Sequence, residues 1–304
     1  MSKRNVRSYY WLDSRLVQNF GDTLGRLVLN SLGYQPVSRQ APQQNVVNPA
    51  RCLLPMGSVL WPRTFAWLTE PADVWGCGWR GIPLPAAIQE RVRFHAVRGP
   101  ATAAGLGLPS DTPLGDPALL LPHLLADQPR RHGRTLVMPH FFCSTSMPAA
   151  QRCRQTGCDA LLAAQVISKP IAGGRVSPQG LQAVVKAALR LGIPVHTTRQ
   201  ALHAIAGADF VLTGSLHGAI VAQTYGVPWA AYADGYVDVP AKWEDWGAYL
   251  GITLEFVANL QSGQEWWQRV GQRGRLRDLQ PLLAAFPYPL AETSFMSRAV
   301  YAKP

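Results

Sequence analysis

Short apolar runs alternate with longer amphipathic stretches along the first half of the chain. The apolar runs predict β-strands, and the stretches Thr23–Leu32 and Pro100–Leu106 predict helices. Residues 36–50 are rich in proline, glutamine and asparagine and are expected to form a loop. The predicted strands of this half are Ser8–Leu12, Arg51–Leu54, Val74–Gly76 and Arg93–Val97.

The second half repeats this alternation. Helices are expected at Pro178–Leu191 and Thr198–Ala206, between further apolar runs. Strands that alternate with helices predict an α/β fold of parallel, doubly wound sheets. The predicted strands of this half are Thr135–Met138, Asp159–Ala163, Pro194–Thr197, Phe210–Leu212 and Trp229–Tyr232.

The polar and basic segment His123–Gly133 predicts a linker between two Rossmann-like domains. We expect an N-terminal domain over residues 1–122, a C-terminal domain over residues 134–285, and a tail over residues 286–304 that packs back on the N-terminal domain. Ligands of open parallel sheets bind at the carboxyl ends of the strands. The two sheets are therefore expected to face each other across a ligand-binding cleft.

The stretch Thr213–Trp229 combines a strand end, a turn of small residues, an apolar helix and a second strand. It places His217 where the helix begins, directly after the strand Phe210–Leu212. The N-terminus of a helix has free N–H groups and a partial positive charge, so it favours anions. A titratable ring beside such a site suggests acid/base chemistry on a phosphate or carboxylate ligand.

Two charged residues near predicted helix starts each have two alternative roles. Asp22 precedes the helix Thr23–Leu32 and either caps it or accepts a sugar hydroxyl, of which the cap is the simpler role. Arg98 follows a strand and precedes a helix that starts with Pro100. It either holds a carboxylate or phosphate through two parallel hydrogen bonds or forms a structural salt bridge.

Weaker candidates follow other predicted strands. His140 lies at the carboxyl end of a strand, where it either faces the cleft or is structural. Lys242 lies at a predicted helix start, where it either reaches an anion in the cleft or is exposed. The small-residue turns Gly57–Leu60 and Trp75–Gly78 either bring backbone N–H groups to a ligand or are plain turns.

The charge of the chain narrows the classes of partner. The net charge of +11 over 304 residues suits nucleic acid, an anionic membrane surface or anionic small substrates. No nucleic-acid motif is present, and arginines do not interleave with aromatic residues along one helix, so we expect no nucleic-acid partner. The pair Trp266–Trp267, with arginines after it, is typical either of a helix at lipid headgroups or of an ordinary helix with core-facing tryptophans.

Cysteines and apolar runs bear on the location of the protein. The five cysteines are odd in number and form no CxxC pair, which favours a reduced protein without a disulfide framework or a zinc site. No apolar run reaches the length of a membrane span, and the basic N-terminus is not followed by the apolar stretch of a signal peptide. We therefore expect a cytoplasmic protein.

An ordered set of short segments points to a known family. The set is Asn19–Asp22, Gly57–Leu60, Val74–Gly78, Val97–Pro100, Leu114–Pro122, Met138–His140, Ser215–Gly218 and Lys242–Trp246. With these segments the chain resembles the polysaccharide pyruvyl transferase family, most closely the ketal-pyruvate transferases of the succinoglycan and xanthan type. The resemblance implies two Rossmann-like domains like those of GT-B glycosyltransferases, with phosphoenolpyruvate as the donor and a hexose of a lipid-linked oligosaccharide as the acceptor.

The resemblance also implies roles for individual residues, with the acceptor on the N-terminal domain and the donor on the C-terminal domain. His217 is expected to be the general acid/base, and Asp22 a base or an acceptor contact. Many relatives have Arg-Leu-His where this chain has Ser215-Leu216-His217, so other cations must bind the charge of the donor. The expected donor-binding residues are Arg98, His140, Ser215, Leu216, Gly218 and Lys242, and the expected acceptor-binding residues are Asn19, Gly57 and Ser58.

The expected function is the formation of a pyruvate ketal on an exopolysaccharide precursor, without a metal or a cofactor. The expected place is the cytoplasm, at the inner face of the membrane if the tryptophan and arginine helix contacts lipid. Two alternatives stay open. One is a GT-B-type glycosyltransferase that uses a nucleotide sugar, and the other is a non-catalytic protein that binds anionic glycans.

Overall fold

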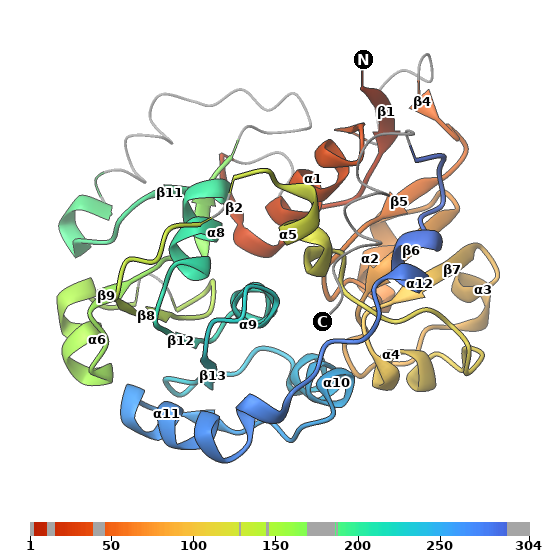
Figure 1. The fold of residues 1–304 in the computed structure, drawn as a ribbon. Coiled ribbons are helices and arrows are strands. Elements are labelled where there is room, and N and C mark those ends of the chain that lie inside the picture. The colour runs from red at the N-terminus through yellow and green to blue at the C-terminus, as the bar shows by residue number, and fades with distance from the viewer. Residues whose placement is uncertain are drawn as a thin grey trace.

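A computed structural model of the chain shows helices packed around small β-sheets (Figure 1). It describes residues 3–10, 16–38, 46–127, 129–143, 146–168, 186 and 188–290. Among these residues, every pairing between named strands is parallel except the one between β2 and β10. The α/β class with parallel sheets, expected from the alternation of strands and helices, is confirmed.

The N-terminal half contains two parallel three-stranded sheets. In one, β6 (Ala72–Cys77) is buried along its whole length and lies between β5 (Cys52–Leu54) and β7 (Val92–Val97). In the other, β1 (Arg4–Arg7) lies between β3 (Tyr34–Val37) and β4 (Val46–Val47). A bridge between Ser8 and Leu53 joins the two sheets. Three short helices of this half are α2 (Pro62–Trp67), α3 (Ala86–Gln89) and α4 (Pro100–Gly105).

The C-terminal half contains a five-stranded parallel sheet with the order β14-β13-β12-β8-β9. Its central strand β12 (Phe210–Thr213) is fully buried, and β8 and β13 coincide with the predicted strands. The strands are β8 (Thr135–Met138), β9 (Ala160–Leu161), β12, β13 (Trp229–Tyr232) and β14 (Phe256–Val257). The helices are α6 (Ala149–Thr156), α8 (Thr198–Ala206), α9 (Leu216–Thr224), α10 (Pro240–Leu250) and α11 (Leu260–Arg269).

Strand β2 (Val17–Asn19) and helix α1 (Phe20–Ser31) connect the two halves. Strand β2 pairs antiparallel with β10 (Gln165–Ile167), which pairs on its other side with β11 (His196–Thr197). Helix α1 contacts β3 on one side and α8 and α9 on the other (Figure 1). A segment near the N-terminus thus adds a strand to the C-terminal half. The predicted domain limits at residues 122 and 134 stay a prediction.

The start of α1 corrects one expectation. The side chain of Asn19 caps the helix, because its oxygen accepts a hydrogen bond from the backbone N–H of Gly21 at 2.8 Å. The helix therefore starts one turn before the predicted Thr23, and Asp22 is a first-turn residue instead of the cap. A carboxylate in the first turn still suits the positive end of the helix dipole.

Other predicted elements differ more in position. Of the predicted strand Ser8–Leu12, residues 11 and 12 lie outside the described residues, and Ser8 forms only an isolated bridge with Leu53. The observed strand β1 precedes it, and only Val6 in β1 is buried, so no continuous apolar run marks it. The predicted helix Pro178–Leu191 lies mostly outside the described residues, of which 188–191 are helical. The predicted linker begins inside α5 (Leu121–Leu124), which continues the short helix η1 (Pro117–Leu120).

The chain returns to the N-terminal half before its end. After η2 (Gly271–Arg273) it forms α12 (Gln280–Ala284), and the indole of Trp75 donates a hydrogen bond to the carbonyl of Leu282 at 2.8 Å. The ring of Phe286 then packs against Trp75 at 4.7 Å between centroids. Residues 291–304 of the predicted tail lie outside the described residues.

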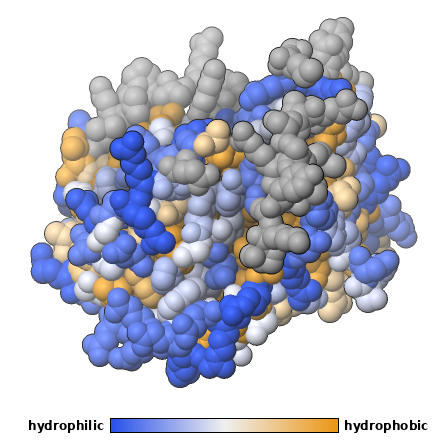
Figure 2. Space-filling model, viewed as in Figure 1, coloured by the Kyte–Doolittle hydropathy of each residue, from blue (hydrophilic) through white to orange (hydrophobic). Residues whose placement is uncertain are grey.

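The tryptophans of α11 face inward. Trp266 is buried and packs on Trp229, with ring centroids 5.6 Å apart, and Trp267 packs against the same core. The lower edge of the molecule, where α11 lies, is mostly hydrophilic on the face shown in Figure 2. These contacts are those of the ordinary amphipathic helix. No helix in the described part of the chain has both the length and the hydropathy that a bilayer crossing requires.

A buried ion pair joins the halves. Arg98, at the carboxyl end of β7, is fully buried, and its Nε lies 3.2 Å from Oδ2 of Asp245 in α10. Asp245 also accepts hydrogen bonds from the backbone N–H and the hydroxyl of Thr102 in α4, at 2.8 and 2.7 Å. Because all these groups are out of water, the loss of either charge leaves the other buried and unpaired. The pair therefore holds α10 against α4.

Replacing Arg98 by Met should lower the free energy of unfolding by about 3–5 kcal/mol, because the carboxylate of Asp245 stays buried without its cation. Urea denaturation measures the change. The matched control is Arg269→Ala, which breaks the exposed pair between Arg269 and Glu255 and should leave the midpoint nearly unchanged. Equal midpoints for both variants would contradict the structural role of Arg98.

Candidate active site

A cavity of about 540 Å³ lies where the segments after several strands meet. These segments follow β1, β2, β5 and β6 of the first half and β8, β12 and β13 of the second. Carboxyl ends of strands thus build the cavity, as expected for parallel sheets. Its lining residues are Tyr9, Asn19, Asp22, Gly57, Ser58, Val59, Trp61, Arg63, Thr64, Trp67, Arg80, His140, Phe141, Phe142, Ser215, Leu216, His217, Asp238 and Lys242.

His217 lies in the first turn of α9, after the N-cap residue Ser215. Its Nε2 is 3.3 Å from Oδ2 of the fully buried Asp116. On the other side, a Cβ added to Gly21 would lie only 2.0 Å from Nδ1, so only glycine leaves room for the ring. The imidazole is therefore held between a carboxylate and the backbone of α1, with 8% of the residue exposed.

Asp116 is a candidate site residue to which the motif analysis gave no role. Its Oδ1 accepts the N–H of Ala118 at 3.0 Å and caps η1, which leaves Oδ2 directed at His217. The sequence signal was an aspartate before proline, which predicts a cap. The pairing with His217 depends on the contact between η1 and α9, which local sequence does not reveal. A carboxylate in this place orients the ring.

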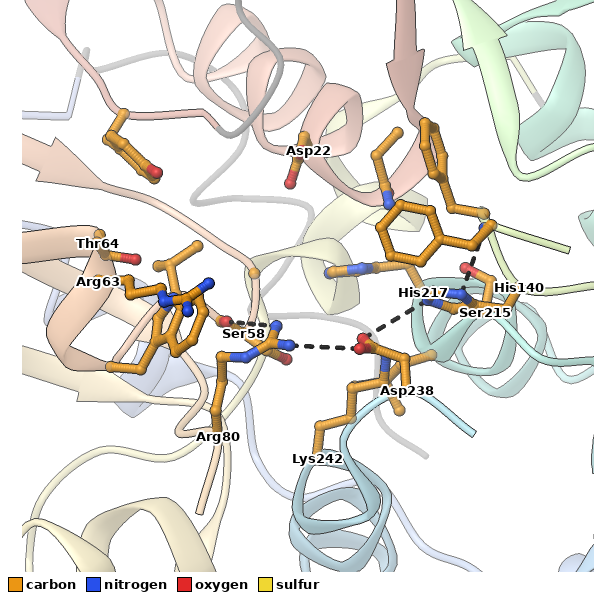
Figure 3. A pocket seen from close by; sticks show the side chains of 18 of the residues that line it. Asp22, Ser58, Arg63, Thr64, Arg80, His140, Ser215, His217, Asp238 and Lys242 are labelled. Carbon is orange, nitrogen blue, oxygen red and sulfur yellow. Dashed lines mark hydrogen bonds and ion pairs between the residues drawn. The ribbon is translucent and has the colours of Figure 1, made fainter. Parts of the chain in front are cut away.

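A second group of charges surrounds Asp238. Lys242 Nζ donates to Oδ2 at 2.8 Å, Arg80 Nη2 donates to Oδ1 at 3.3 Å, and His140 Nε2 lies 3.6 Å from Oδ2. Figure 3 shows Arg80, Lys242 and His140 converging on Asp238 from different sides. The guanidinium of Arg80 also stacks on the ring of Trp61, with its Cζ 4.8 Å from the ring centroid. The sequence contained no motif for Arg80 or Asp238.

Burial and these neighbours shift two pKa values. Burial acts to raise the pKa of Asp238, but the hydrogen bond with His140 and the charges of Lys242 and Arg80 outweigh it and hold the pKa well below its ordinary value. Burial is the largest effect on Lys242 and lowers its pKa, with Asp238 opposing and Arg98 and Arg80 adding to the decrease. The cluster thus holds more cationic groups than the single carboxylate balances.

The structure brings most of the expected site residues to this cavity. Asn19, Asp22, Gly57, Ser58, His140, Ser215, Leu216, His217 and Lys242 all line it. Gly218 does not line the cavity. A Cβ on this residue would lie 2.4 Å from Oγ1 of Thr213, so the glycine allows α9 to pack closely on the strand that precedes it.

Arg98 is the other exception. Its guanidinium lies behind the wall of the cavity, paired with Asp245, and its Nη1 donates to Oγ of Ser58 at 2.8 Å. A Cβ on Gly78 would come within 1.9 Å of Nη2, so the group fills the space behind that turn. Of its two expected roles, the structure shows the salt bridge, and Arg98 reaches the cavity only through Ser58. The cations on the wall are Arg63, Arg80 and Lys242.

Comparison with known proteins gives one family and one curated relative. A profile of the polysaccharide pyruvyl transferase family matches residues 74–236. The succinoglycan biosynthesis protein ExoV of Rhizobium meliloti (strain 1021) is 24% identical over 249 residues, which are 82% of this chain and 66% of that protein. The chain thus matches slightly less than two thirds of the relative's length.

Solved structures are only weakly similar. The S. aureus MnaA–UDP structure has a TM-score of 0.47 and 11% identity and overlaps 90% of each chain. The UDP-GlcNAc 2-epimerase of Methanocaldococcus jannaschii has a TM-score of 0.32 and 8% identity, over 87% of this chain and 91% of that one. Likeness at this level says nothing about function.

The family profile covers more than half of the chain, and the matched span contains Asp116, His140 and His217. The similarity to ExoV agrees with the succinoglycan-type branch. This chain belongs to the polysaccharide pyruvyl transferase family.

Proposed function

We propose that the protein transfers pyruvate from phosphoenolpyruvate to a hexose of an exopolysaccharide precursor and forms a cyclic ketal. The observation that carries the proposal is the convergence of the His217–Asp116 pair and the cations around Asp238 on one cavity. An anionic donor needs the cations, and proton transfer needs the histidine. Membership of the family supports the type of reaction.

The donor is proposed to bind between the cations and the start of α9. Arg80 and Lys242 supply positive charge for its carboxylate and phosphate, and the first backbone N–H groups of α9 supply further donors. In this role Arg80 and Lys242 take the place of the arginine that stands in many relatives at the position of Ser215. Asp238, already bonded to both cations, keeps them pointed into the cavity.

The chemistry follows from phosphoenolpyruvate being a masked enol. A proton is added to its methylene carbon, which becomes the methyl group, and the central carbon becomes electrophilic. One sugar hydroxyl attacks that carbon, phosphate leaves, and a second hydroxyl closes the ring. Of the two hydroxyl protons, one balances the proton on the methyl group and the other leaves with phosphate. His217 moves the proton, held by Asp116, and Asp22 is the second group in reach of an acceptor hydroxyl.

The proposal extends to the acceptor and its location. We assign the acceptor to a lipid-linked oligosaccharide at the inner face of the cytoplasmic membrane, and the reaction to a scheme without a metal or a cofactor. The net charge of +11 supports contact with an anionic membrane surface. Arg269, at the end of α11, and Arg273, just after it, are both exposed and can make such a contact. The tryptophans of α11 take no part in it, because they face the core.

Incubation of the purified protein with phosphoenolpyruvate and a depyruvylated succinoglycan repeating unit should release phosphate and add a pyruvate ketal to the glycan. Phosphate release and mass spectrometry of the glycan measure the two products. Parallel incubations with nucleotide sugars test the glycosyltransferase alternative. Release of a nucleotide, with no phosphate released from phosphoenolpyruvate, would overturn the proposal.

His217→Gln should lower kcat for ketal formation by roughly 10²–10⁴-fold, because the proton-transfer group is lost. Asp116→Asn should also lower kcat, with a smaller effect on the donor KM, because the ring loses its orienting carboxylate. The matched control His203→Gln changes a histidine outside the cavity, which pairs with Asp127. The assignment fails if His217→Gln turns over like the control while its circular dichroism matches that of the parent.

The lowered pKa of Lys242 predicts an alkaline limit to donor use. Lys242 is charged below that pKa, so kcat/KM for phosphoenolpyruvate should fall as the pH rises through it, below the ordinary range of lysine. In Lys242→Arg the cation persists, so the alkaline limb should move to higher pH. A limb at the same pH in both proteins would show that Lys242 does not bind the donor.

A further inference from the structure

The reaction proposed above uses one end of the cavity and leaves the wall formed by α2 without a role. This wall consists of Trp61, which is the N-cap residue of α2, and of Arg63, Thr64 and Trp67. Trp61, Thr64 and Trp67 recur every third residue and therefore share one side of the helix. In Figure 3, Arg63 and Thr64 lie across the cavity from His140 and His217.

The two ends of the cavity differ in chemistry. The end near His217 carries Asp238 and Lys242, and Arg80 reaches Asp238 from the α2 side, where its guanidinium lies 4.8 Å over the ring of Trp61. The α2 wall presents the indole of Trp67, the hydroxyl of Thr64 and the guanidinium of Arg63, while the ring of Trp61 is covered by the guanidinium groups of Arg63 and Arg80. Trp67 lines the cavity and is 74% exposed, so much of its indole is accessible to a ligand at this wall. An exposed indole that lines a cavity beside polar groups offers a flat apolar face on which a ligand can lie.

A sugar ring fits such a surface better than an anion does. Its C–H groups form an apolar face that can lie on an indole, and its rim of hydroxyls needs donors and acceptors at the edge. Arg63 and Thr64 supply these beside the two tryptophans. The guanidinium of Arg63 lies 5.4 Å from the centroid of Trp61, so its donors are already placed.

The size of the cavity agrees with more than one occupant. Its volume of about 540 Å³ falls within the range of roughly 300–1,000 Å³ found for pockets that hold drug-sized ligands. A donor as small as phosphoenolpyruvate and one sugar at His217 use the part near the cations. The part along α2 remains for a further portion of the acceptor.

We propose that the α2 wall, formed by Trp61, Arg63, Thr64 and Trp67, is a subsite for a second sugar of the acceptor glycan, adjacent to the sugar that receives pyruvate. The inference rests on the proposed function for the identity of the acceptor. It makes α2 a determinant of acceptor specificity, since a monosaccharide cannot occupy both positions. The enzyme should therefore use an oligosaccharide better than the corresponding monosaccharide.

The kinetic test compares acceptors of graded length in the full chain. For Trp67→Ala, KM for fragments of depyruvylated succinoglycan should rise about tenfold, while KM for phosphoenolpyruvate and for a monosaccharide acceptor stays unchanged. Trp67→Phe keeps an aromatic face and should recover most of the affinity. Ile82→Ala removes an exposed apolar side chain outside the cavity and serves as the matched control. An unchanged oligosaccharide KM in Trp67→Ala would overturn the subsite.

A binding test without donor separates this inference from the proposed function. In protein labelled with 5-fluorotryptophan, the resonance lost in Trp67→Phe identifies Trp67. Succinoglycan fragments from disaccharide upward should shift that resonance, and the monosaccharide should not. A shift without any turnover of phosphoenolpyruvate would refute the proposed reaction and keep the glycan subsite. Turnover with no shift from any fragment would refute the subsite and keep the reaction.

Discussion

The buried ion pair between Arg98 and Asp245 is the constraint on which the cavity depends. Asp245 takes hydrogen bonds from Thr102 as well as from Arg98, so its charge is compensated by α4 and by the end of β7. The same pair fixes both sides of the cavity wall. Arg98 holds the hydroxyl of Ser58, and α10 carries Lys242 one turn before Asp245. Breaking the pair would leave a buried charge unpaired behind both of these wall residues.

Charged groups inside the cavity are held by other charged groups. Asp116 has one oxygen used as a helix cap and the other at His217, and Asp238 has both oxygens used by cations. Such mutual arrangement leaves little reorganisation for the moment of reaction, which is how preorganised sites stabilise developing charge. The opposite wall, on α2, combines aromatic rings with the guanidinium of Arg63.

Much of the fold was predictable from local pattern. Strands such as Thr135–Met138 and Trp229–Tyr232 are mostly apolar runs in parallel sheets. The helix Thr198–Ala206 has a capping box, so each of these signals is complete within a few residues. Where local signals were weak or competed with each other, the predicted element boundaries were displaced from the observed ones. Asn19 and Asp22 are both good caps, and only the antiparallel pairing of β2 with β10 sets where the chain turns into α1.

The candidate site divides in the same way. The sequence by itself determined which residues follow strand ends, and so it placed His217, His140 and Lys242 near a common edge, because parallel strands end together. The sequence did not determine which of these side chains form ion pairs with each other. Only the tertiary structure decided that Arg98 pairs with Asp245 and that Asp116 meets His217. The partners of each pair lie far apart in the chain, and they meet because α10 packs on α4 and α9 packs on η1.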